Sequence, residues 1–121
     1  MLAHGAVLLR SGIFTSEQVA AIARDYRNAG LTPAEVAMMA FAEQVTARAN
    51  TVTRDDIAAL RRRGFSDPEI LDIALTAGAR CFFSKVLDGV GAAPDEAYLS
   101  LDEGVRQSLA VGRPFGERTA S

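Results

Sequence analysis

The residue types that most often carry chemistry are scarce in this chain, which has one cysteine, Cys81, and one histidine, His4. A nucleophilic thiol needs a cation, a helix N-terminus or a neighbouring base that lowers its pKa. Cys81 instead lies in a long apolar stretch, next to Phe82 and Phe83. We therefore expect Cys81 to be a small, buried packing residue. With a single cysteine, the chain cannot form a disulfide within one subunit.

His4 is a natural proton carrier, because histidine titrates near neutral pH. A metal site would need further ligands of its kind or nearby carboxylates. From the residues alone, a partly exposed histidine near the N-terminus is the favoured interpretation. We expect neither a metal ion nor a cofactor.

The charged clusters are explained by helix ends. Three arginines at residues 61–63 precede Gly64, and Asp55 with Asp56 follows Thr53. Cations at the end of a helix and acids in its first turn both complement the helix dipole. The acids could do acid/base work, but the pattern does not favour it. No glycine-rich phosphate loop or nucleophile elbow is present.

The composition is typical of one globular domain. The chain has 121 residues, of which 49 % are hydrophobic and 23 % charged, enough to bury a core without metal or disulfide. Its net charge of −2 lacks the basic surplus of nucleic-acid binders. No leader segment or long apolar run is evident, so we expect a cytoplasmic protein without a membrane partner.

Helix starts are well marked. A hydroxyl residue followed three positions later by an acid or amide forms a capping box, and no segment alternates as a strand does. The expected starts are Thr15, Thr32, Thr53, Ser66 and Ser100. We predict an all-α fold, with helices at about residues 2–10, 15–30, 32–50, 53–64, 67–88 and 101–110.

The predicted helix at about residues 67–88 is the longest. It has no charge between Asp72 and Arg80, and residues 73–79 are apolar or small apart from Thr76. Such a helix is usually buried on most sides. We expect a bundle of helical hairpins with this helix at its centre, and a subunit contact along it.

Three short motifs follow one another along the chain. They are LTPAE at residues 31–35, FAEQVT at 41–46 and GFSDPEILD at 64–72. The order resembles the carboxymuconolactone decarboxylase family, and more narrowly its alkyl hydroperoxidase D-like, peroxidase-related branch. The resemblance covers about residues 2–91. It implies an N-terminally incomplete domain at residues 1–91 and a C-terminal extension at 92–121, with a short helix at about 101–110.

The resemblance implies an all-helical homo-oligomer: a trimer, a hexamer or a dimer. Redox-active members of this family are thiol-dependent peroxidases, antioxidant oxidoreductases with peroxiredoxin activity. They carry C-x-x-C-x-x-x-H on a helix, with a glutamate upstream. One thiolate attacks the peroxide, and the second thiol resolves the sulfenic acid.

The segment LAHGAVLLR at residues 2–10 resembles the end of that motif. His4 then matches the motif histidine and is the candidate catalytic residue, as a remnant proton relay. Counting back from His4 places the second motif cysteine one position before Met1. Both motif cysteines and the glutamate are therefore absent, and Cys81 inherits no role. A peroxide is a substrate only if the missing motif is supplied.

Three functions stay open at this point. The first is membership of the peroxidase-related family, with the chain inactive or truncated as written. The second is a non-catalytic oligomeric scaffold, and the third is a lyase that decarboxylates a small lactone acid without thiols. A shortened reading frame and a natural short relative both fit the first function. A frame encoding C-x-x-C directly upstream of Met1 would distinguish them.

Overall fold

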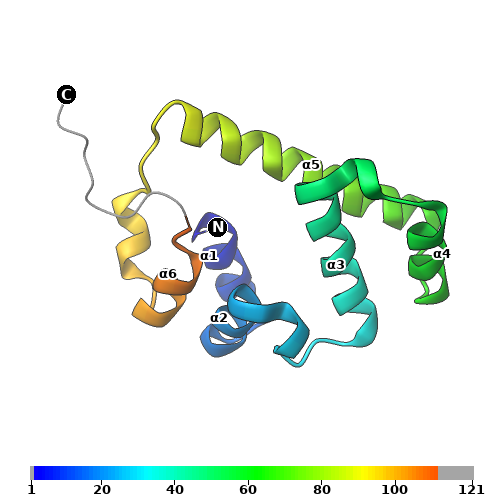
Figure 1. The fold of residues 1–121 in the computed structure, drawn as a ribbon. Helices are drawn as coiled ribbons and strands as arrows, with labels where there is room; N and C mark the ends of the chain where they lie inside the picture. The colour runs from blue at the N-terminus through cyan, green and yellow to red at the C-terminus, as the bar shows by residue number, and fades with distance from the viewer. Residues whose placement is uncertain (1, 112–121) are drawn as a thin grey trace. The chain divides into compact units, whose positions relative to one another are not determined.

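Helices make up all the regular structure of the described residues, 2–111, in the computed structural model (Figure 1). No strand occurs in this range, which confirms the all-α prediction. Neither the longest helix nor any other in this range is apolar enough over a sufficient length to cross a bilayer. The helices are α1 (Leu2–Ser11), α2 (Ser16–Asp25), α3 (Pro33–Arg48), α4 (Arg54–Arg62), α5 (Asp67–Gly89) and α6 (Glu103–Leu109), with short 3₁₀ turns at Tyr26–Asn28, Ala49–Thr51 and Glu96–Ser100.

Four of the five predicted helix starts are confirmed. At the start of α3, Thr32 Oγ1 accepts a hydrogen bond from the Glu35 amide at 3.2 Å, and Glu35 Oε2 accepts one from the Thr32 amide at 2.8 Å. Each box satisfies two backbone donors that the helix leaves without an internal partner. The same reciprocal pair begins α2, α4 and α5, at Thr15, Thr53 and Ser66.

The fifth predicted start, at Ser100, is wrong. Ser100 ends a 3₁₀ turn, and its hydroxyl donates to the Ala97 carbonyl at 2.8 Å. Asp102 caps α6 instead, since its Oδ1 accepts from the amides of Gly104 at 3.0 Å and Val105 at 3.3 Å. The preceding turn therefore moves the helix start two residues along the chain.

The chain divides into two compact units. One, here called the terminal unit, combines residues 2–30 with residues 91–111 of the described range, and the other, the middle unit, is residues 31–90. The sequence-based division into residues 1–91 and 92–121 stays a prediction.

The core of the terminal unit joins both ends of the described chain. Val105 of α6 is 0 % exposed, and it clusters with Leu2, Val19 and Leu109. Gly5 lies against Leu109, and a Cβ at Gly5 would collide with the Leu109 side chain. The absence of a side chain at Gly5 therefore lets α1 and α6 approach closely.

The core of the middle unit is built by α3, α4 and α5. Each helix contributes one buried side chain, Phe41, Leu60 and Ile70 respectively. Around them pack seven half-buried residues: Ala37, Val45, Val52, Ile57, Phe65, Ile73 and Ala74.

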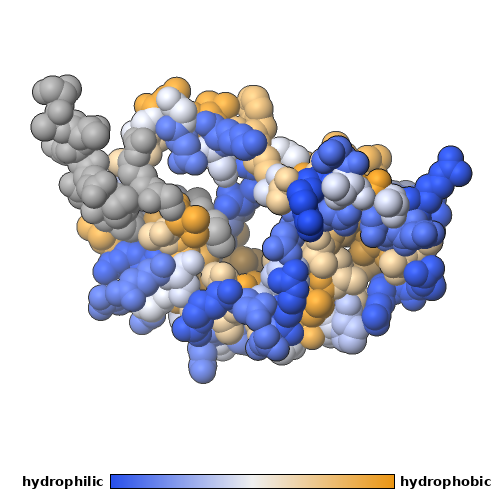
Figure 2. Space-filling model, viewed as in Figure 1, coloured by the Kyte–Doolittle hydropathy of each residue, from blue (hydrophilic) through white to orange (hydrophobic). Residues whose placement is uncertain are grey.

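Helix α5 is covered on one side only. Ile70 and Ala77 are buried, whereas Leu71, Leu75 and Phe82 are exposed. Figure 2 shows hydrophobic surface along the upper edge of this helix. The prediction that residues 73–79 are buried on most sides is therefore wrong for the single chain. Within the middle unit only α3 and α4 pack on α5, and two helices cannot enclose a third.

Candidate functional site

Cys81, the only thiol, is half-buried on α5 rather than fully buried as predicted. It belongs to neither buried core cluster of the described residues. The nearest cation in sequence is Arg80, whose Nη1 donates to Ser84 Oγ at 3.2 Å. The Arg80 guanidinium is thus directed along the helix toward Ser84, and the geometry assigns it no role in activating the thiol.

His4 is exposed on α1, in the terminal unit, whereas Cys81 belongs to the middle unit. The structure therefore does not assemble these two predicted residues within one compact unit. No group of three or more His, Cys, Asp or Glu side chains able to hold a metal ion is found among residues 2–111.

One residue of the acidic cluster and one of the basic cluster, Asp56 and Arg61, have structural roles. Asp56 Oδ2 accepts from the Thr53 amide at 2.8 Å, from the Thr53 hydroxyl at 2.9 Å and from Gln44 Nε2 at 3.3 Å. The hydrogen bonds from Thr53, first of all the backbone one, hold the pKa of Asp56 below its ordinary value. A carboxylate kept ionised in this way caps α4 and is poorly suited to donate a proton as a general acid.

Arg61, the first of the three arginines, pairs with the start of the next helix. Its Nε donates to Asp67 Oδ1 at 2.6 Å. The hydrogen bond from Arg61 lowers the pKa of Asp67, and the same bond raises the pKa of Arg61. Both side chains are more than half exposed, at 55 % and 68 %. The pair therefore contributes little stability and offers no free anion site.

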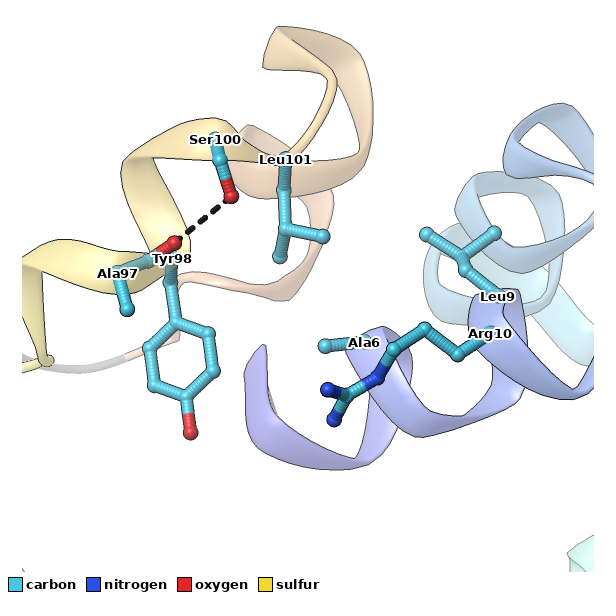
Figure 3. Close-up of a pocket in the computed structure, with 7 residues that line it drawn as sticks. All are labelled: Ala6, Leu9, Arg10, Ala97, Tyr98, Ser100 and Leu101. Atoms are coloured by element: carbon cyan, nitrogen blue, oxygen red, sulfur yellow. Dashed lines mark hydrogen bonds between the residues drawn. The ribbon is translucent and has the colours of Figure 1, made fainter.

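A pocket in the terminal unit was not expected from the sequence. It has a volume of about 360 Å³ and lies between α1 and the turn Glu96–Ser100. Figure 3 shows the Arg10 side chain extending along α1 on the side of the helix that faces Tyr98. The lining is otherwise mostly apolar; in full it is Ala6, Leu9, Arg10, Ala97, Tyr98, Ser100 and Leu101.

This pocket combines one cation and one phenol with apolar walls. Such a lining suits a small apolar molecule with a carboxylate, because the guanidinium matches the anion and the walls match the rest. His4 does not line it. It precedes Ala6 by two positions, so its Cβ points about 160° away around the helix. No spacing rule links Arg10 to Tyr98, since the two residues come from opposite ends of the chain.

Comparisons of the chain with known protein families, with curated proteins and with solved structures find no match. The family resemblance is therefore carried by the sequence motifs alone. Two of these motifs coincide with helix starts, where Thr32 and Glu35 or Ser66 and Glu69 form capping boxes. Capping explains these residue types whatever the protein does.

Proposed function

We propose that this chain is a non-catalytic, self-associating helical protein of the alkyl hydroperoxidase D-like type, within the carboxymuconolactone decarboxylase family. The observation that carries self-association is the uncovered apolar side of α5, where Leu71, Leu75 and Phe82 are exposed in the single chain. A contiguous exposed apolar surface on a helix commonly marks an interaction site.

The arrangement of the reactive residues supports the absence of peroxidase chemistry. A two-thiol peroxidase forms a sulfenic acid on one cysteine and condenses it with a second cysteine, releasing water. These 121 residues contain one cysteine, Cys81. The remnant relay residue His4 belongs to the terminal unit, whereas this thiol belongs to the middle unit. The proton relay therefore has no thiol pair to serve.

A peroxidase assay on the purified chain tests this proposal. Cumene hydroperoxide is mixed with dithiothreitol, with and without the protein, and peroxide consumption is followed. We expect no turnover above the dithiothreitol background, for the wild-type chain and equally for Cys81→Ala and His4→Ala. Turnover that Cys81→Ala abolishes would show that the thiol is catalytic and would overturn the proposal.

The pocket between Arg10 and Tyr98 favours a second candidate function, lyase chemistry on a small lactone acid. Arg10 would bind the substrate carboxylate, and the apolar wall would hold its carbon skeleton. Nuclear magnetic resonance titration with a small lactone acid tests binding in the pocket. Shifts around Arg10 and Tyr98 that disappear in Arg10→Gln support this candidate, whereas the absence of shifts removes it.

A further inference from the structure

Helix α5 has two apolar faces, and only one of them packs inside the middle unit. The inner face contributes Ile70 and Ala77 to buried positions. The other face, here called the outer stripe, consists of Leu71, Leu75, Phe82 and Val86, which are 58 %, 60 %, 71 % and 46 % exposed. At about 100° per residue these four side chains fall within an arc of about 60°. They therefore form one continuous line along the helix.

The amount of exposed apolar surface is that of a protein interface. The four residues of the stripe expose roughly 80–170 Å² each at these fractions, and two exposed residues, Phe83 and Val90, lie beside them. Together the six present on the order of 700 Å², close to what each partner contributes to a standard interface.

We propose that the outer stripe binds the outer stripe of a second copy of this chain, with the two α5 helices antiparallel. This proposal rests on the proposed self-association and names its surface. The stripe is nearly symmetric about Gly78, with Leu71 and Leu75 before it and Phe82 and Val86 after it, at similar spacings. A two-fold axis beside Gly78 therefore places Leu75 opposite the partner's Phe82. Leu71 then lies opposite the partner's Val86, as a self-complementary interface requires.

Gly78 lies at the centre of the stripe and has no side chain, so the backbone is accessible there. A Cβ built at Gly78 meets no atom within 4 Å, so no contact among the described residues requires a glycine there. A glycine inside a helix costs roughly 0.5–1 kcal/mol relative to alanine. Close approach of a second helix gives a reason for it, because the distance between packed helices is set by the side chains at the contact.

The charge pattern favours an apolar partner. No charged residue lies between Asp72 and Arg80, and Arg80 is engaged with Ser84 on the half-buried side of the helix. The four side chains of the stripe offer a nucleic acid or a charged peptide no complementary group, and the two exposed charged residues beside them, Asp72 and Lys85, have opposite signs. A second outer stripe matches it in both polarity and length.

Sedimentation of the full chain at micromolar concentration tests the proposal. We expect a dimer, or an assembly with an even number of chains, and a dissociation constant at least ~10-fold higher for Leu75→Glu. Val7→Glu is the matched control, since Val7 is 57 % exposed on α1 of the terminal unit. It should keep the wild-type mass. A wild-type monomer, as expected if the terminal unit covers the stripe, overturns the proposal, and so does unchanged association of Leu75→Glu.

Cross-linking gives a second test that does not depend on how Leu75→Glu folds. In a Cys81→Ala background, Gly78→Cys should form a disulfide-linked dimer under mild oxidation, because the two thiols meet near the two-fold axis. Gly89→Cys is the control, since a Cβ at Gly89 also meets open space. Its thiols would lie on the order of 30 Å apart in the antiparallel pair.

The cross-linking outcomes separate the geometry from the proposed function. A dimer linked through Gly78→Cys but not through Gly89→Cys supports the antiparallel pair. Linking through Gly89→Cys instead indicates parallel helices and overturns it. Dimer mass without linkage through Gly78→Cys also overturns this surface, while self-association itself still stands.

Discussion

The two units of the chain are stabilised in different ways. The middle unit is one contiguous stretch, in which α3, α4 and α5 each begin with a capping box and contribute one buried side chain to a small core. The terminal unit brings together segments from both ends of the described chain, and its Val105 is completely enclosed. Capping boxes therefore begin every α-helix of the middle unit but only α2 of the terminal unit. Packing between segments far apart in the sequence holds the terminal unit together.

The two units also differ in how much of the helix surface is packed inside the unit. In the terminal unit, α1 approaches α6 so closely that Gly5 has no space for a Cβ. In the middle unit, α5 leaves a whole apolar face exposed, and Gly78 faces open space. The first unit is closely packed, and the second leaves one apolar helix face without packing inside the unit.

The largest effect is expected from truncating the middle core. Phe41→Ala should destabilise the middle unit by about 3–5 kcal/mol, because it removes a buried aromatic ring and leaves a cavity. Hydrogen exchange followed by mass spectrometry should show lost protection in residues 31–90 first. Val105→Ala, at about 2 kcal/mol, should give the opposite pattern, with loss first in the terminal unit. Equal loss throughout the chain in both variants would contradict two separable units.

Gly5→Ala should have the next largest effect, in the terminal unit. Alanine favours a helix, but its Cβ would collide with Leu109. Overpacking of this kind costs about 1–3 kcal/mol, more than the gain in helix propensity. Thermal unfolding should therefore occur at a lower temperature than in the wild-type chain. An unchanged or higher midpoint would show that α1 and α6 separate at little cost.

Local chemistry accounts for what could be predicted from the sequence. The boxes at Thr15, Thr32, Thr53 and Ser66 depend on residues three positions apart, so the spacing alone predicts them. The start at Ser100 was wrong because a 3₁₀ turn already uses that hydroxyl.

Packing accounts for what could not be predicted. The pattern of α5 shows an apolar helix, but whether Leu75 is buried depends on how many neighbours the fold supplies. The pocket between Arg10 and Tyr98 joins residues that no local rule connects. His4 and Cys81 could be identified by type, but not by their separation into different units.

Gly78→Ala should have a smaller effect, with the opposite sign to Gly5→Ala. At concentrations low enough for a monomer, it should stabilise the middle unit by roughly 0.5–1 kcal/mol, because alanine favours the helix and its Cβ meets open space. Sedimentation of the same variant should show weaker self-association. Destabilisation of the dilute monomer would show that Gly78 is needed within the chain itself.

The smallest effect concerns pH. Hydrogen bonds from Thr32, Thr53 and Ser66, the backbone ones first, lower the pKa of the box carboxylates Glu35, Asp56 and Glu69. A group whose pKa is lower in the folded state than in the unfolded state stabilises the fold at pH values above its unfolded-state pKa. This contribution is lost as the pH falls through the folded-state pKa. The middle unit should therefore weaken as pH falls below about 4.

The box of α2 supplies the control for this effect, because its amide partner, Gln18, does not titrate. Glu69→Gln gives α5 the same kind of box, and should keep the cap while reducing the acid sensitivity of the middle unit. Denaturant unfolding at pH values from about 6 to 3 measures the difference between variant and wild type. The effect is small because the carboxylates are close to solvent. An identical pH dependence in Glu69→Gln would mean that its cap contributes the same whether or not the side chain is charged.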